Sequence, residues 1–330
     1  MRALGRLFLL AILAGIAAGA WLYWFSTHAL ALPATPFEFT VRNGMSVKAL
    51  SRQLADEGLF LEPHSFWIVA RALGKSGAIQ AGTYRLDRPL TPVDLLEKLA
   101  RGDVVLAEMT FVEGTTFRQW RAQLAQQPRV RATLAGKTEA ELRTLFGLGD
   151  DSTEGWFFPD TYRFAPGTSD VDLLKRAHGA MKKRLADAWA ARDPDVPLKS
   201  PYEALILASI VEKETGVAAE RPVIAAVFAN RLKRGMRLQT DPTVIYGIGE
   251  KYDGNIRKRD LTTDTPWNTY TRDGLPPTPI AMPGAGSLAA VAHPAQSEYL
   301  YFVGKGDGTH YFSKTLEEHN RAVAKYQLKR

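Results

Sequence analysis

The amino-acid sequence predicts an α+β protein that has a single N-terminal transmembrane helix, a small α+β domain and a larger mixed α+β domain. Three observations support this fold class: an uncharged apolar run near the N-terminus, alternating strand and helix patterns over residues 37–102, and helical patterns that give way to a tail rich in proline and glycine. With 330 residues, 45% of them hydrophobic, the chain is long enough for two packed cores. We expect the larger domain to occupy residues 108–330.

The first expected element is a transmembrane helix over residues 7–25, a run of 19 residues without a charge. At the helical rise, this run is long enough to cross a hydrocarbon core of roughly 30 Å. Arg2 and Arg6 precede it, and positive charge on that side predicts a cytoplasmic tip at residues 1–6, with the rest of the chain in the periplasm. Aromatic residues gather at the other end, as in a membrane-interface belt: Trp21, Tyr23, Trp24 and Phe25.

A cleavable signal peptide is the alternative to an anchor, because residues 29–31 form the small-residue pattern Ala-Leu-Ala. The apolar run exceeds the roughly 7–15 residues of a usual signal-peptide core, so the sequence favours an uncleaved anchor. Residues 29–36 then contain two prolines and no helical period. This composition predicts a short tether between the anchor and the first folded domain.

The small domain is expected over residues 37–102. Residues 37–41 alternate apolar and polar side chains, which predicts a strand, and Ser46 is placed to cap a helix that begins at Val47. A second helix is expected over residues 66–73 and a second strand over 82–86. A capping box at residues 91–94, with proline at the first helical position, starts a third helix.

The larger domain begins with a strand pattern at residues 108–112 and continues with helices. Helical spacing covers the ranges 117–124, 139–145, 170–190 and 201–214. From Leu238 onward the sequence is dense in proline and glycine, and strand-like fragments occur at 299–303 and 309–312. A last helix is expected over residues 316–326.

Composition and charge narrow the classes of function. The formal net charge of +7 suits an anionic partner, whether nucleic acid, anionic lipid or a wall polymer with carboxylates. The absence of cysteine excludes disulfides, thiol catalysis and a cysteine-based zinc site. The six histidines form no HExxH pair, so this common metal-site motif is absent from the sequence. Nucleic acid is disfavoured because the folded domains should lie outside the cytoplasm and no recognised binding signature is present.

Two glutamates stand at the end of an apolar helical stretch, just before a glycine stop at Gly216. With roughly 100° of rotation per residue, Glu214 lies in the direction of Leu207 and Val211, whereas Glu212 lies at the margin of the apolar face. We therefore expect Glu214 to be the more buried carboxyl. Burial raises a carboxyl pKa and keeps the acid protonated, as protonation of a glycosidic oxygen requires. The alternative, usual for helix-end glutamates, is surface pairing with Lys213 or Arg221.

Several stretches carry a resemblance to one family: residues 154–162 (EGWFFPDTY), 208–215, 230–232, 236–247, 268–270, 274–277 and 293–295. On these stretches the chain resembles the endolytic murein transglycosylases, the MltG or YceG-like family. The resemblance implies an inner-membrane helix, a LysM-like domain over residues 37–102 and a catalytic transglycosylase domain over 108–330. It also implies three kinds of partner: peptidoglycan glycan strands, the inner membrane through residues 7–25, and cell-wall synthesis enzymes.

The resemblance further implies that the glutamate directly before Thr215 is catalytic, which is Glu214. Ordinary glycosidases use two carboxylates. A lytic transglycosylase needs one, because the 6-hydroxyl of N-acetylmuramic acid (MurNAc) attacks its own anomeric carbon. The expected reaction cuts the bond from MurNAc to N-acetylglucosamine (GlcNAc) in nascent strands and leaves 1,6-anhydro-MurNAc ends, without a metal or a cofactor.

Hydrogen-bonding side chains that could hold sugars lie on two segments that follow the acid. The expected substrate-binding residues are Gln239, Thr240, Asp241, Thr243, Tyr246, Asn268 and Tyr270. The same residues have an ordinary structural interpretation, because Asp-Pro and Asn-Thr pairs form turns and Tyr246 could belong to a core. Both interpretations stay open from sequence.

Two other functions compete with the transglycosylase. A muramidase would hydrolyse the same bond with water and use Asp241 as its second carboxylate. A non-catalytic scaffold would bind the wall through residues 37–102 and recruit synthesis enzymes. The muramidase predicts reducing ends on its products, and the scaffold predicts that Glu214 is dispensable.

Overall fold

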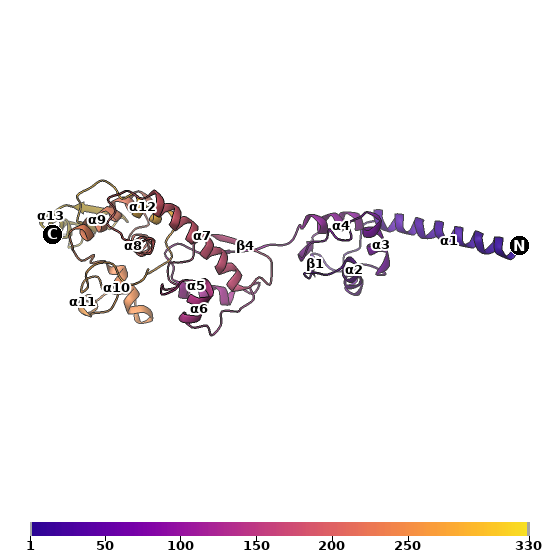
Figure 1. Cartoon of the computed structure of the whole chain (residues 1–330), viewed down its shortest axis with the longest axis horizontal. Helices are drawn as coiled ribbons and strands as arrows, with labels where there is room; N and C mark the ends of the chain where they lie inside the picture. Colours follow the sequence, from indigo (N-terminus) through magenta and orange to yellow (C-terminus); the bar gives the residue numbers. More distant parts are fainter. Residues whose placement is uncertain (1, 329–330) are drawn as a thin grey trace. The chain divides into compact units, whose positions relative to one another are not determined.

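The computed structural model describes residues 2–328, and these divide into two compact units (Figure 1). Unit 1 comprises the chain up to Ala107 together with Arg163–Gly167, and unit 2 comprises Glu108–Tyr162 and the chain from Thr168 onward. Met1, in the expected cytoplasmic tip, and residues 329–330, at the end of the expected larger domain, lie outside the described residues. The fold class is confirmed as mixed helix and strand.

Unit 1 begins with helix α1 (Arg2–Thr27). Its Phe8–Thr27 portion has a mean hydropathy of 1.9 and is the one helix among residues 2–328 that is long and apolar enough to cross a membrane. Large apolar side chains such as Phe8 and Ile16 are exposed along it. An exposed apolar surface of this kind is what lipid would cover, so the helix is consistent with the expected anchor over residues 7–25.

The end of α1 packs into the core of unit 1. Phe25 lies edge-on against Phe60 with ring centroids 5.8 Å apart, and the Trp21 indole donates a 2.9 Å hydrogen bond to the Ser65 hydroxyl. Leu30 is buried, and its amide donates to the Leu90 carbonyl. Residues 29–36 contain no helix or strand, as expected of a tether, and the start of this tether is docked on unit 1 through Leu30.

The rest of unit 1 has the expected order of elements. Strand β1 (Phe37–Val41) pairs antiparallel with β2 (Gly82–Leu86), and three helices cover them: α2 (Val47–Asp56), α3 (His64–Ala72) and α4 (Pro92–Arg101). Ser46 caps α2, and Thr91 and Asp94 form the capping box of α4. The predicted elements are confirmed, with α3 beginning two residues early, while the likeness to LysM stays a prediction.

Unit 2 is built around helix α8. The elements before it are β3 (Ala107–Thr110), α5 (Phe117–Gln126), α6 (Glu139–Phe146), β4 (Thr161–Phe164) and α7 (Asp170–Ala191). Strand β3 pairs with β4, and Ala107 of β3 and residues 163–164 of β4 are counted with unit 1. Helix α8 (Pro201–Glu214) is buried along residues 204–211 and packs against α7, α9 (Arg221–Lys233), α10 (Asp241–Ile248) and α12 (Ala285–Ala292). A helix enclosed in this way is held rigidly, which fixes the position of whatever its end carries.

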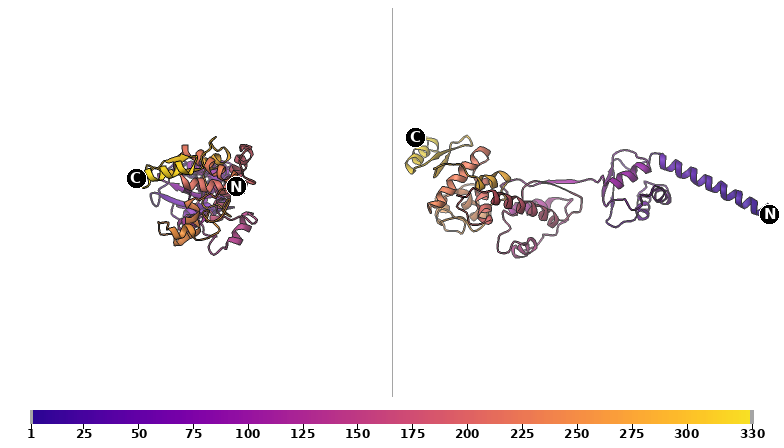
Figure 2. Two further views of the ribbon diagram at one scale, coloured as in Figure 1. Left: turned by 90° about the vertical axis from the view of Figure 1, so that its left-hand side faces the viewer. Right: turned by 45° about the horizontal axis from the view of Figure 1, so that its top comes forward.

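The C-terminal part of unit 2 contains the hairpin β5 (Tyr301–Gly304) and β6 (His310–Ser313), followed by α13 (Leu316–Tyr326). Figure 2 shows this yellow segment gathered on one side of the unit. The strand-like fragments and the last helix are thus confirmed. Sequence patterns missed β4, α9, α10, α11 (Lys258–Thr262) and α12. Helix α10 was missed because Asp241-Pro242 suggests a turn, yet proline fits the first turn of a helix, where its missing N–H needs no partner.

Candidate active site

The end of α8 is positioned by features along its whole length. Ser200 caps its first turn by accepting from the Glu203 amide, and Pro201 occupies the first helical position. The Ser209 hydroxyl donates to the Ile206 carbonyl and accepts from the Ile280 amide, which ties the helix to the loop before α12. The backbone becomes extended at Thr215. Helix α8 therefore delivers Glu212 and Glu214 to fixed places on two sides of its last turn.

Glu214 faces a pocket of about 450 Å³, which we call the Glu214 pocket. Its side chain accepts a hydrogen bond from the Thr240 hydroxyl. The pKa of Glu214 is raised to about 7, chiefly by burial and also by the negative charge of Asp241, while the hydrogen bond from Thr240 opposes the rise. A carboxyl with this pKa can both give up and regain a proton near neutral pH.

Glu212 differs from the sequence-based expectation. Its side chain is only 5% exposed, so the prediction that it lies at the margin of the buried face was wrong. It accepts from the Gly284 amide at 3.0 Å and the Ser287 hydroxyl at 2.7 Å, and it pairs with Arg221 at 3.5 Å. These partners come from α9 and the start of α12, which the rotation of one helix cannot reveal. Glu212 therefore ties α8 to its neighbours.

Four of the seven predicted binding residues line the Glu214 pocket: Gln239, Thr240, Asp241 and Tyr270. The Tyr270 hydroxyl donates a 2.6 Å hydrogen bond to Asp241. Gln239 has a φ of 52° and is the one non-glycine residue with positive φ that the structure describes. Such strain often marks a functional site. Two hydrogen bonds hold it, from its own amide to the Thr269 carbonyl and from Arg231 to its side chain.

The other three predicted residues do not line this pocket. Thr243 is buried and donates to the Thr240 carbonyl. The Asn268 amide group donates to three backbone carbonyls, of Asp260, Leu261 and Thr263, and so fixes the loop after α11. Tyr246 lines a different pocket, where its hydroxyl donates to Glu154. The structural interpretation fits Thr243 and Asn268.

Sequence reasoning missed five polar side chains that line the Glu214 pocket: Arg231, Tyr301, His310, His319 and Gln327. Arg231 is buried and donates to the carbonyls of Leu300 and Leu238, which connects α9 to the hairpin. His310 Nδ1 lies 2.7 Å from Glu220, which also accepts from Thr215. No local spacing links these residues to Glu214, because they come from α9, β5, β6, α13 and the residue that follows α13. Among these residues, Arg231 could have been found from sequence, because it lies in a stretch that resembles the family.

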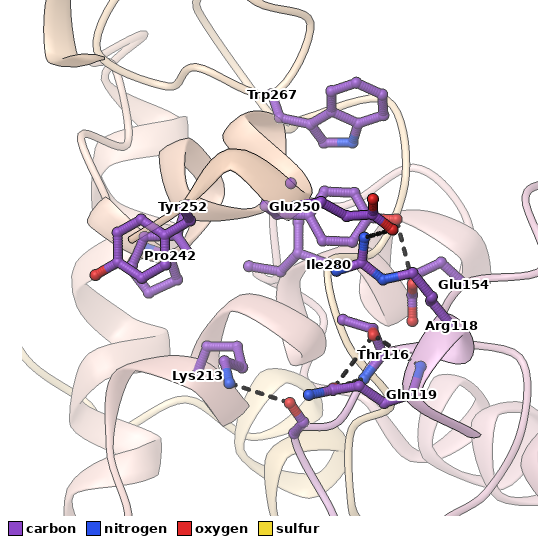
Figure 3. A pocket seen from close by; sticks show the side chains of 14 residues that line it. Thr116, Arg118, Gln119, Glu154, Lys213, Pro242, Glu250, Tyr252, Trp267 and Ile280 are labelled. Carbon is purple, nitrogen blue, oxygen red and sulfur yellow. Dashed lines mark hydrogen bonds and ion pairs between the residues drawn. The ribbon is translucent and has the colours of Figure 1, made fainter. Parts of the chain in front are cut away.

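A second pocket, of about 560 Å³, lies around Glu154 and is called the Glu154 pocket (Figure 3). Glu154 is 5% exposed, and burial raises its pKa to about 7, although hydrogen bonds from the Phe117 amide and the Tyr246 hydroxyl oppose this. Glu154 lies in the EGWFFPDTY stretch but was given no role from sequence. Within residues 2–328, no group of three or more acidic or histidine side chains is arranged to hold a metal ion.

The YceG-like family model matches residues 39–325, which span both units. The chain belongs to the YceG-like family. Its relatives in this family are named endolytic murein transglycosylases, so the family is one of lytic transglycosylases.

Individual relatives agree with this assignment. An endolytic murein transglycosylase of Bacillus subtilis (strain 168) is 34% identical over 322 residues, covering 88% of this chain and 85% of that protein. One from Streptococcus pneumoniae (strain D39) is 28% identical and covers 87% of this chain but 57% of that longer protein. The crystal structure of a YceG-like protein from Listeria monocytogenes matches with a TM-score of 0.57 and 30% identity, covering 87% of this chain and 98% of that one.

Proposed function

We propose that this chain is an endolytic peptidoglycan transglycosylase that cuts the MurNAc–GlcNAc bond, with Glu214 as its catalytic acid and base. One observation carries the proposal: a carboxyl with a pKa near 7 stands at the end of a buried helix and faces a pocket lined by polar side chains. The names of the family's relatives supply the substrate class.

In the proposed reaction, Glu214 is protonated at the start. It donates its proton to the glycosidic oxygen as the bond from the MurNAc anomeric carbon to that oxygen breaks. The carboxylate then accepts the proton of the MurNAc 6-hydroxyl, whose oxygen bonds to the same anomeric carbon. Atoms and charges balance without water, and Glu214 ends in its initial protonated state. The intramolecular attack benefits from a high effective concentration of the hydroxyl.

The neighbours of Glu214 have proposed supporting roles. Asp241, held by Tyr270, places negative charge in the same pocket, where it favours the positive charge that develops on the sugar ring. Thr240 orients the Glu214 carboxyl through its hydrogen bond. Gln239 and Arg231 present a fixed polar wall, suited to sugar hydroxyls and N-acetyl groups.

We also propose that α1 anchors the chain in the inner membrane, with the N-terminus cytoplasmic and the chain that follows α1 periplasmic, and that the enzyme acts on nascent strands. The exposed apolar surface of the Phe8–Thr27 portion and the basic residues before it support this topology. Reporter fusions at the C-terminus test it. A C-terminal reporter that works only in the cytoplasm should be silent, and its activity would refute the orientation. A mature chain that starts near Leu32 would refute the uncleaved anchor.

The role of unit 1 is proposed as binding or positioning of glycan, as the resemblance to LysM implies. We expect the full ectodomain to sediment with insoluble peptidoglycan, and a chain that lacks residues 37–102 to sediment less. Equal sedimentation of the two would remove the binding role. Recruitment of cell-wall synthesis enzymes by a non-catalytic scaffold predicts instead that Glu214→Gln leaves cellular function intact.

The muramidase remains the second candidate, because Asp241 lines the same pocket as Glu214 and could activate a water. Loss of cutting by Glu214→Gln supports either enzyme and excludes the scaffold. The two enzymes differ in the ends that they leave on the strand, and the mass of the released fragments distinguishes these ends.

A further inference from the structure

The Glu154 pocket adjoins the Glu214 pocket at the junction of α8 and α10. Lys213 and Pro242 line the Glu154 pocket, while their chain neighbours Glu214 and Asp241 line the other one. Consecutive Cα atoms lie about 3.8 Å apart, so the two linings meet at two points of the chain. The end of α8 and the start of α10 therefore form a wall that the two pockets share.

The walls of the Glu154 pocket combine aromatic faces with a buried polar group. Trp267 and Tyr252 line it, and Tyr246 lies edge-on to Trp267 with ring centroids 5.5 Å apart. The Trp267 indole donates to Thr278, which fixes its ring. Behind them, Glu154 accepts from the Phe117 amide at 2.9 Å and from the Tyr246 hydroxyl at 3.2 Å. Aromatic faces with an adjacent hydrogen-bonding group suit the apolar face and the polar edge of a sugar.

The lining of the Glu154 pocket includes a solvent-exposed cation, Arg118, whose ion pair with Glu250 is drawn in Figure 3. Arg118 pairs with Glu250 at 2.7 Å, and the two side chains are 60% and 78% exposed. An exposed ion pair adds little to stability, so the guanidinium can exchange Glu250 for another carboxylate with little loss. Lys213, which donates to the Gly114 carbonyl, adds positive charge to the same lining.

We propose that the Glu154 pocket is a second sugar subsite that recognises a carboxylate-bearing, N-acetylated amino sugar, and that Arg118 leaves Glu250 to bind the carboxylate. This inference rests on the proposed function, because it assigns the second subsite to the same strand that Glu214 cuts. The carboxylate belongs to the stem peptide, or to the lactyl group of a MurNAc from which the peptide has been removed. In the free enzyme, Glu250 occupies Arg118 and acts as an internal competitor.

Because Glu250 competes with the ligand for Arg118, substitutions of these two residues should change binding in opposite directions. Arg118→Gln removes the recognising cation and should weaken binding about 10- to 100-fold, the range for a charged hydrogen bond. Glu250→Gln removes the competitor and should tighten binding. If the ion pair served structure alone, the two variants would shift binding in the same direction. The exposed pair Arg272–Asp264 lines neither pocket and gives matched controls, Arg272→Gln and Asp264→Asn, for loss of either charge.

Binding is measured by calorimetry with the full chain in detergent, in a Glu214→Gln background that suppresses cutting. Three tetrasaccharide probes are compared: two GlcNAc–MurNAc units with stem peptides, the same units after amidase removal of the peptides, and chitotetraose, which has no carboxylate. Opposite shifts for Arg118→Gln and Glu250→Gln with either carboxylate-bearing probe support the proposal. The lactyl carboxyl is amide-bonded to the stem peptide and becomes free only after amidase treatment, so opposite shifts with the peptide-bearing probe assign the carboxylate to the stem peptide, and opposite shifts with the amidase-treated probe alone assign it to the lactyl group.

The proposal is overturned if Arg118→Gln and Glu250→Gln shift binding in the same direction. It is also overturned if the control variants Arg272→Gln and Asp264→Asn shift binding as much as these two do, or if the opposite shifts persist with chitotetraose. Direct binding separates this failure from that of the proposed function. Cutting by Glu214→Gln, detected as released fragments, would refute the catalytic assignment without changing the sign of either Arg118 or Glu250 effect.

Discussion

The last turn of α8 presents one glutamate to each of two regions, and the two regions treat the carboxyl in opposite ways. On the α12 side, Glu212 meets an amide, a hydroxyl and the Arg221 guanidinium. On the α10 side, Glu214 accepts one hydrogen bond from the residues that the structure describes, that of the Thr240 hydroxyl, and lies near the negative charge of Asp241. The comparison teaches that burial alone does not distinguish a structural carboxyl from a chemical one. The number and charge of its partners do.

The largest expected effect is the loss of cutting in Glu214→Gln. The amide keeps the shape of the carboxyl but cannot donate and recover a proton, a function worth roughly 10²–10⁴-fold in rate. Because one group makes both transfers, we expect a loss at the upper end of this range or beyond. Release of soluble fragments from purified strands measures it. Glu212→Gln is the matched control, and cutting by Glu214→Gln at near the wild-type rate would remove the distinction between the two regions.

A second prediction concerns stability, for which Glu212 should matter more than Glu214. Glu212→Gln leaves the guanidinium of Arg221 without its buried partner, so we expect the free energy of unfolding to fall by about 1–3 kcal/mol. Activity per folded molecule should remain. Glu214→Gln removes an acid with few partners, and its melting temperature should stay or rise. Thermal melting of both variants tests this contrast, which fails if Glu214→Gln is the less stable of the two.

The sequence predicts features that depend on neighbouring residues, but not contacts between residues far apart in the chain. The elements of unit 1 follow from local alternation and caps such as Ser46 and Thr91, because those signals lie within a few residues. Glu214 follows from its place before Thr215 in a recognisable stretch. The partners of Glu212 could not be predicted, because Gly284 and Ser287 lie about 70 residues away and only the packing of α12 brings them in. The same holds for Arg231 and His310 in the Glu214 pocket.

The pH dependence of stability sharpens the comparison further. The pKa of Glu214 is raised from 4.5 to about 7 in the folded chain, so the folded state binds this proton more tightly than the unfolded state does. The contribution of Glu214 to the free energy of unfolding should therefore fall as pH rises from about 4.5 through 7. Glu214→Gln lacks this group, so its melting temperature relative to wild type should rise over the same window. A difference in melting temperature that is flat between pH 5 and 8 would contradict the raised pKa.

The smallest expected effect is that of Thr240→Val, which removes the hydroxyl that donates to Glu214. This hydrogen bond lowers the pKa of Glu214, so its loss should raise that pKa. Cutting requires the protonated acid at the start, and the upper limb of the pH–rate profile should move to higher pH. We expect a change in rate below about tenfold, as for one hydrogen bond. Thr240→Ser keeps the hydroxyl and should keep the wild-type profile; an unshifted profile in Thr240→Val would show that the bond does not tune the acid.

The central claim is that Glu214 alone moves protons while the sugar's own hydroxyl attacks, and product mass in ¹⁸O-labelled water tests it most directly. Wild-type enzyme should release fragments that are lighter by one water than hydrolytic products and carry no label, because no solvent oxygen enters the 1,6-anhydro ring. Glu214→Gln should release none, and Glu212→Gln should release the same unlabelled fragments as wild type. Labelled reducing ends from wild-type enzyme would mean that water attacks, and the muramidase with Asp241 would replace the account. Loss of fragments in Glu212→Gln alone would place the acid on the other side of α8.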